Sequence, residues 1–91
     1  MTLHDPHETR RKRLLWRATR RGIKEMDLIV GGFAAANLAG MDSDTLDAFE
    51  RLLDIPDTDL LAYATNQATI PLHLKSALLE AVLVFRPDVT R

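Results

Sequence analysis

Apolar residues recur every three to four positions along most of the chain, a spacing that predicts helices and no sheet. Glycine and proline interrupt this pattern and divide it into five segments. The expected helices run from about Glu8 to Arg20, from about Gly22 to Ala39, from a cap at Ser43 or Asp44 to just before Pro56, from Asp57 to Thr65, and from Pro71 to just before Pro87. Their short connections predict an all-α fold, a compact five-helix antiparallel bundle.

Each expected helix has an apolar face that we predict to be buried. The predicted buried positions are Leu14, Leu15 and Ala18 in the first helix, Ile23, Met26, Val30, Phe33 and Asn37 with flanking Ile29 and Leu38 in the second, Leu46, Phe49, Leu52 and Leu53 in the third, and Leu60, Leu61 and Tyr63 in the fourth. The arginines of the first helix, together with Asp47, Glu50 and Arg51, should face water, and Asp57 should cap the fourth helix. The fifth helix is apolar around most of its circumference, which favours a central position.

The chain length sets the domain organisation. Ninety-one residues leave room for one modest hydrophobic core, so residues 8–86 are predicted to form a single domain. We expect residues 1–7 to be a flexible N-terminal tail and residues 87–91 a C-terminal tail.

Two adjacent glycines, Gly31 and Gly32, interrupt the second helix. Each weakens it by roughly 0.5–1 kcal/mol relative to alanine. They predict either a close approach of another backbone segment or a kink or early end of the helix.

Composition excludes several classes of protein. The chain has no cysteine, so it contains no disulfide, thiolate nucleophile or cysteine metal site. Residues 28–40 carry no charge, but this run is shorter than the ~20 residues of a membrane-spanning helix, so no membrane insertion is expected. The net charge is only −1, yet basic residues concentrate in the first quarter and acidic residues between Asp42 and Asp59. This asymmetry indicates either a partner surface or two faces of one domain that attract each other.

No arrangement typical of a catalytic or metal site is present. His4 and His7 have a spacing that would chelate a metal on a helix, but they sit in the polar tail with Pro6 between them, so we predict no metal site. His73 stands alone in the fifth segment, without a partner for acid–base catalysis. The acids that follow Asp42 lack the glycine and glutamate of a calcium-binding EF-hand loop and favour a solvated helix face. We therefore expect a protein that is not an enzyme.

The segment RRGIKEMD, residues 20–27, concentrates charge at the expected connection between the first two helices. Gly22 suits the left-handed position that ends a helix. The preceding arginines favour a helix C-terminus, and Glu25 and Asp27 favour the next N-terminus. A structural corner explains these features, but not why so much charge crowds a small surface beside Trp16.

The stretch RLLWRATRRGIKEMD, residues 13–27, resembles the succinate dehydrogenase assembly factor family, whose members help the flavoprotein subunit acquire covalent FAD. Family members carry an arginine, an aromatic residue, and an arginine-glycine-x-x-glutamate motif followed by an apolar residue and an aspartate. These elements fall here on Arg13, Trp16, Arg21, Gly22, Glu25, Met26 and Asp27. The segment FERLLDIPDTDLLAYAT, residues 49–65, is also similar to the family, although Tyr63 stands where members often have tryptophan.

The resemblance implies an assembly chaperone that binds the flavoprotein subunit of succinate dehydrogenase, with the fumarate reductase flavoprotein as a further client. It implies that FAD becomes attached in the partner's own site and that this chain binds no cofactor stably itself. The expected partner-binding residues are Arg13, Trp16, Arg17, Arg20, Arg21, Gly22, Glu25 and Asp27. Glu25 would either hold Arg21 or accept a hydrogen bond from the partner. We expect a monomer, located in the cytoplasm of a bacterium or in the mitochondrial matrix of a eukaryote.

Two other functions stay open on the sequence, both ranked below the assembly factor. A basic first helix with Trp16 is also found in small nucleic-acid-binding modules, which would depend on residues 10–13. The acidic middle and the lack of a polar recognition helix count against that function. The second alternative is an interaction module for an unrelated protein partner.

Overall fold

The computed structural model describes residues 7–87, and this part of the chain is all-α, as predicted. Its elements are α1 (Glu8–Ala18), α2 (Lys24–Asn37), the short 3₁₀ helix η1 (Leu38–Gly40), α3 (Ser43–Leu53), α4 (Asp57–Ala64) and α5 (Ala77–Val84). The tails predicted at residues 1–7 and 87–91 lie outside the described residues, apart from His7 and Pro87.

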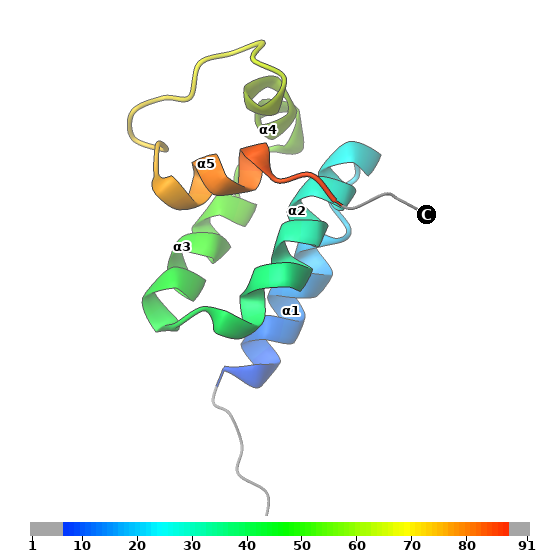
Figure 1. The fold of residues 1–91 in the computed structure, drawn as a ribbon, viewed down its shortest axis with the longest axis vertical. Coiled ribbons are helices and arrows are strands. Elements are labelled where there is room, and N and C mark those ends of the chain that lie inside the picture. The colour runs from blue at the N-terminus through cyan, green and yellow to red at the C-terminus, as the bar shows by residue number, and fades with distance from the viewer. Residues whose placement is uncertain (1–6, 88–91) are drawn as a thin grey trace, which may run out of the picture.

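The first three helices run side by side in alternating directions, and the last two cover one end of this layer (Figure 1). α4 packs against α2, and α5 lies across α2, α3 and α4. The bundle is therefore antiparallel through α3, whereas α5 crosses it.

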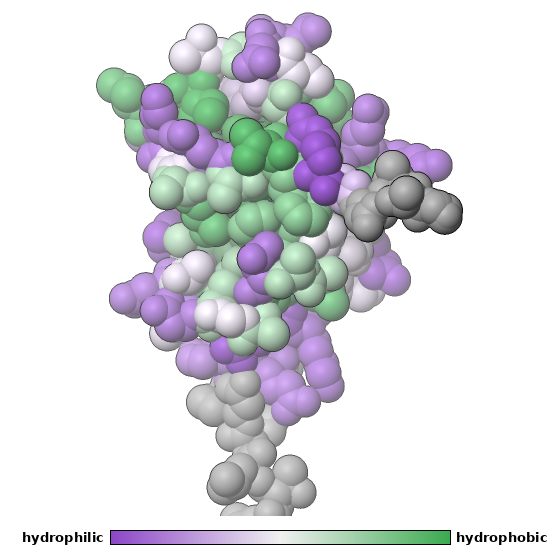
Figure 2. All heavy atoms as spheres, in the orientation of Figure 1, coloured by the Kyte–Doolittle hydropathy of each residue, from purple (hydrophilic) through white to green (hydrophobic). Residues whose placement is uncertain are grey.

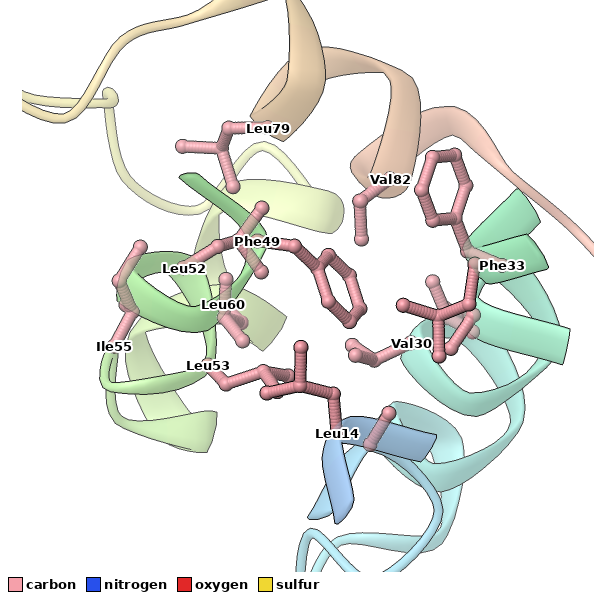
Figure 3. Packing of buried hydrophobic residues seen from close by; sticks show 14 of the residues in the cluster. Leu14, Val30, Phe33, Phe49, Leu52, Leu53, Ile55, Leu60, Leu79 and Val82 are labelled. Carbon is pink, nitrogen blue, oxygen red and sulfur yellow. The ribbon is translucent and has the colours of Figure 1, made fainter. Parts of the chain in front are cut away.

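The hydrophobic core is centred on Phe49 of α3, whose side chain is fully buried. Figure 3 shows Leu14, Val30 and Val82 around it, so three other helices meet at this ring. The Phe33 ring stacks against Phe49 at a centroid distance of 6.2 Å. Burial of each such side chain contributes roughly 1.5–3 kcal/mol to folding, and packing therefore accounts for the position of α5 over α2 and α3.

Gly31 marks a close approach between α2 and the end of α1, as one of the two sequence interpretations proposed. A Cβ atom at Gly31 would lie 2.8 Å from Thr19 Cγ2 and 3.2 Å from Thr19 Cα. At Gly32, the same atom would lie 2.9 Å from the Phe85 ring. α2 continues past both glycines to Asn37. The glycines thus serve packing, and α2 does not end early.

Replacing Gly31 by alanine is expected to destabilise the protein, because Thr19 would have to move away from α2. Overpacking of this kind costs roughly 1–3 kcal/mol, more than the ~0.5–1 kcal/mol that alanine adds to helix propensity. Gly40 provides a matched control, since a Cβ atom there meets nothing within 4 Å. Gly40→Ala should be neutral or stabilising by about 0.4–1 kcal/mol. Urea unfolding of both variants measures the difference, and equal midpoints would contradict this account of Gly31.

Two predicted helix caps are wrong. α3 is capped by Asp42, whose carboxylate accepts a hydrogen bond from the Thr45 N–H at 2.9 Å, so neither Ser43 nor Asp44 is the cap. That hydrogen bond lowers the pKa of Asp42 below its ordinary value. α4 begins after Pro56, whose side chain has no acceptor for a cap, and the Asp57 carboxylate accepts a hydrogen bond from Arg21 instead.

The fifth helix is much shorter than predicted. It begins only after Ser76, whose hydroxyl accepts a hydrogen bond from the Leu79 N–H and so satisfies a free donor of the first turn. Upstream, Lys75 N–H donates to the Pro71 carbonyl, which makes a single turn that does not continue into α5. Leu72 is therefore 87% exposed. The central position predicted for this helix is confirmed only for its last part, where Leu79 and Val82 are buried.

Leu15 and Asn37 were predicted to be buried, and both are exposed. α1 buries the narrow face formed by Leu14 and Ala18, which leaves Leu15 beside it. The Asn37 amide lies at the end of α2 and donates to the Phe33 carbonyl at 2.9 Å. The error at Leu15 arises because the buried face of α1 is narrower than its apolar pattern, and the error at Asn37 arises because this polar residue ends α2.

Charged residues of α1 and α3 that were predicted to face water instead hold the two helices together. Arg10 Nη2 lies 2.5 Å from Asp47 and 2.8 Å from Glu50. The hydrogen bonds that Arg10 donates to these carboxylates, first to Asp47 and then to Glu50, raise its pKa above the ordinary value. Arg11 donates to the carbonyls of Leu38 and Met41. Part of the basic first quarter is therefore neutralised inside the fold.

One face of the molecule gathers apolar side chains across its middle, with polar side chains around them (Figure 2). Val84 of α5 is 75% exposed.

Within residues 7–87, no helix combines the length and the apolar character needed to cross a membrane.

Candidate functional site

The outer face of α1 carries an exposed aromatic residue among arginines. Their spacing of three, one and three residues places four side chains on one side of the helix and its C-terminal turn: Arg13, Trp16, Arg17 and Arg20. Trp16 is 58% exposed, and the Arg20 guanidinium lies 4.8 Å from its ring centroid. This cation–π contact holds both side chains at the surface in a defined position.

The turn between α1 and α2 depends on Gly22. Its φ is +98°, a backbone conformation that L residues with side chains rarely adopt. After it, α2 begins at Lys24 and has Glu25 and Asp27 in its first turn, where acids are favoured by the helix dipole. The Asp27 carboxylate accepts a hydrogen bond from the Arg21 backbone N–H at 2.5 Å. This contact closes the turn.

Arg21 lies inside the structure and fastens this corner to the connection between α3 and α4. Its Nε donates to Asp57 Oδ1 at 2.6 Å, and its Nη1 and Nη2 donate to the carbonyls of Leu53 and Ile55 at 2.6 and 2.8 Å. The Arg21 side chain is 8% exposed and that of Asp57 17%. The guanidinium is thus satisfied by residues more than thirty positions away.

The eight predicted site residues separate into two groups. Exposed on the corner are Arg13, Trp16, Arg20, Gly22 and Glu25; half-buried or inside it are Arg17, Arg21 and Asp27. Arg17 pairs with Asp54 at 3.0 Å. Neither Arg13 nor Glu25 has a hydrogen-bond or ion-pair partner within residues 7–87. We call the exposed group, together with Arg17, the corner surface.

Sequence reasoning missed the contribution of the α3–α4 connection. Residues 53–57 line an open hollow of about 410 Å³ together with Trp16 and Arg17 of α1 and Arg20 and Arg21 of the turn that follows it. Asp54 and Asp57 supply its acidic side. The sequence feature that could have indicated this contribution is the charge asymmetry. Basic residues of the first quarter do pair with acids of the middle, at Asp47, Glu50, Asp54 and Asp57.

The corner surface has the composition of a protein-binding site. Tryptophan and arginine are enriched among the residues that dominate interface energies. Arginine offers planar donors for carboxylates and carbonyls, and the free Glu25 offers an acceptor. Within residues 7–87, no three His, Asp or Glu side chains are grouped so that they could hold a metal ion. His4, part of the pair considered for metal binding, lies outside the described residues.

Comparison with known proteins decides the family. Residues 12–86 match the family described as flavinator of succinate dehydrogenase. The chain belongs to this family. The match covers all helices described here except the first residues of α1, and it confirms the resemblance seen in the sequence.

Individual relatives come from fungi and bacteria. The chain is 40% identical over 63 residues to the mitochondrial succinate dehydrogenase assembly factor 2 of Yarrowia lipolytica, and 39% identical over 75 residues to that of Saccharomyces cerevisiae strain ATCC 204508 / S288c. These alignments cover 69% and 81% of this chain. It is also 37% identical over 62 residues, 68% of its length, to the FAD assembly factor SdhE of Acetobacter pasteurianus.

The chain spans only part of these relatives: 43% of the Yarrowia protein, 46% of the Saccharomyces protein and 57% of the Acetobacter protein.

Proposed function

We propose that this protein is an assembly factor that binds the flavoprotein subunit of succinate dehydrogenase and promotes covalent attachment of FAD to it. The observation that supports this most directly is the corner surface, which lies within the region shared with the flavinator family. The surface combines an exposed Trp16, arginines around it, and a free Glu25 beside Gly22.

The corner surface is suited to hold a partner backbone in a defined position. A Cβ atom at Gly22 would meet only Asp57 Oδ2 at 3.9 Å, so the space above this residue is open to another chain. Trp16 supplies rigid contact area, and Arg13 and Glu25 supply a donor and an acceptor that no residue of the described chain uses. The hydrogen bonds of Arg21 fix this arrangement before the partner arrives, which lowers the entropy cost of binding.

FAD and the histidine that accepts it belong to the partner in this proposal. The hollow beside Trp16 is open rather than enclosed, whereas sites for small ligands bury most of the ligand surface. The described residues therefore suit a flat protein contact better than a stable flavin site. The chain would act as a non-enzymatic chaperone and a monomer, with the fumarate reductase flavoprotein as a further client, in the bacterial cytoplasm or the mitochondrial matrix.

A nucleic-acid-binding function has less support than the assembly function. Arg10, Arg17 and Arg21 each pair with acids of the same chain. These guanidinium groups are already neutralised, so the positive surface is smaller than the sequence indicates.

Covalent flavin on the flavoprotein tests the proposal. We expect its fluorescence on a denaturing gel to disappear in cells that lack this protein and to return when the wild-type chain is supplied. Glu25→Gln should restore much less of it, because the neutral amide loses a charge-assisted hydrogen bond to the partner. Glu80→Gln, which changes another exposed carboxylate, on α5, is the matched control and should restore it fully. Unchanged fluorescence after deletion would refute the assembly function.

A further inference from the structure

A second hollow lies on the other side of the α3–α4 connection, between α3 and α5. Its volume is about 250 Å³. The lining comes from the last two turns of α3 and from the segment that leads into α5: Ala48, Arg51, Leu52, Ile55, His73, Leu74, Lys75, Ser76 and Leu79. Ile55 borders both this hollow and the one at the corner surface.

The rim of this hollow is basic and has no internal counter-charge. Arg51, His73 and Lys75 are exposed, and none of their side chains makes a hydrogen bond or ion pair within residues 7–87. This distinguishes them from Arg10, Arg17 and Arg21, which are all neutralised by carboxylates of this chain. The free positive charge of α3 and the α5 connection is therefore available to a ligand.

The floor of the hollow is apolar. Leu52 and Leu79 are buried core residues whose edges reach it, and Leu74 is packed against the same core. A ligand for this site needs an apolar group for the floor and an anionic group for the rim. A cavity of about 250 Å³ holds a single large side chain rather than a nucleotide or a cofactor.

We propose that this hollow docks a segment of a protein partner in which a leucine-like side chain stands next to acidic residues. The apolar side chain enters the hollow, and the neighbouring carboxylates reach Arg51 and Lys75. Charge complementarity carries this assignment, because two uncompensated cations, Arg51 and Lys75, stand beside one apolar opening. The inference does not rest on the proposed assembly function, since the site uses none of the corner-surface residues.

The test is an NMR titration of the full isotope-labelled chain with a blocked tripeptide of the order glutamate, leucine, glutamate. We expect amide shifts to concentrate at residues 48–55 and 73–79. The double variant Arg51→Gln with Lys75→Gln should bind about tenfold more weakly, the effect of losing two partly exposed ion pairs. The matched control, Lys12→Gln with Lys24→Gln, removes the same charge from exposed positions elsewhere and should bind like wild type.

Three outcomes would overturn the proposal. Equal shifts with the tripeptide lysine, leucine, lysine would show that charge does not select the ligand. Equal shifts with sodium acetate at the same concentration would show a small-anion site rather than peptide docking. Shifts at these residues that depend on protein concentration without peptide would show that a second copy of the chain occupies the hollow.

Discussion

Cells whose only copy of this protein carries Gly22→Arg are expected to contain a folded assembly factor and a flavoprotein without covalent FAD. The arginine side chain would project from an exposed turn into the space that the proposed partner backbone occupies. The substitution also forces a non-glycine residue to a φ near +98°, at a cost of roughly 1–2 kcal/mol. That is a fraction of the 5–15 kcal/mol of a typical domain, so the fold should persist. Fluorescence of covalent flavin and circular dichroism of the purified variant measure the two effects.

Gly22→Ala separates the effect of backbone strain from that of steric obstruction of the partner. Both variants have the same backbone strain, but only the arginine side chain is large enough to fill the partner's space. We expect the two to unfold at similar urea concentrations, with alanine retaining much more flavinylation. If alanine abolished flavinylation as completely as arginine, the turn conformation rather than the open space would be the essential property of Gly22. A folded Gly22→Arg protein with full activity would refute the assignment of this corner as the partner surface.

Arg21→Ala is expected to cause the largest loss of stability of any single substitution in the corner. It removes three hydrogen bonds and leaves the Asp57 carboxylate and the Leu53 and Ile55 carbonyls without their donor. Breaking a pair with this little exposure costs roughly 3–5 kcal/mol. For a domain of this size, that corresponds to a fall in melting temperature of more than about 10 °C. Thermal unfolding followed by circular dichroism measures it directly.

Arg20→Ala is the neighbouring control, since Arg20 is exposed and contacts Trp16 instead of a buried carboxylate. Loss of its cation–π contact should cost about 0.5–1 kcal/mol. The loss of stability caused by Arg21→Lys should lie between those of the two alanine variants, because an ammonium group lacks the planar arrangement of donors that reaches three acceptors at once. If Arg20→Ala and Arg21→Ala unfolded at the same temperature, Arg21 would not be the anchor described above.

The sequence predicted the helical fold and the family, because both depend on local features. The apolar face of α3, from Leu46 to Leu53, is read from spacing alone, and the structure buries it as expected. The start of α5 was not predictable in the same way. Pro71 suits the first turn of a helix, but the Ser76 hydroxyl caps a later start, and only tertiary packing decides between the two.

For the candidate site, too, the sequence did not predict which individual side chains point inward. Residues 13–27 were selected as one group because they are close in sequence, but spacing does not reveal which members point inward. The partner of Arg21 is Asp57, thirty-six positions away, and not the nearby Glu25. The excess of acids in the middle of the chain predicted attraction between the two segments, but it did not assign individual pairs. The separation of corner residues into exposed and internal groups required the structure.

The hydrogen bonds of Arg21 also set an order of events during synthesis. Residues 13–27 leave the ribosome before Leu53, Ile55 and Asp57, which hold the guanidinium in place. The corner therefore acquires its final shape only after the α3–α4 connection has emerged and docked. A nascent or truncated chain that ends before Asp57 would carry the whole motif in its sequence and still lack the surface that the motif forms. Recognition by the partner would thus report that α1 is docked on the end of α3 and the start of α4, and would reject chains that end before Asp57.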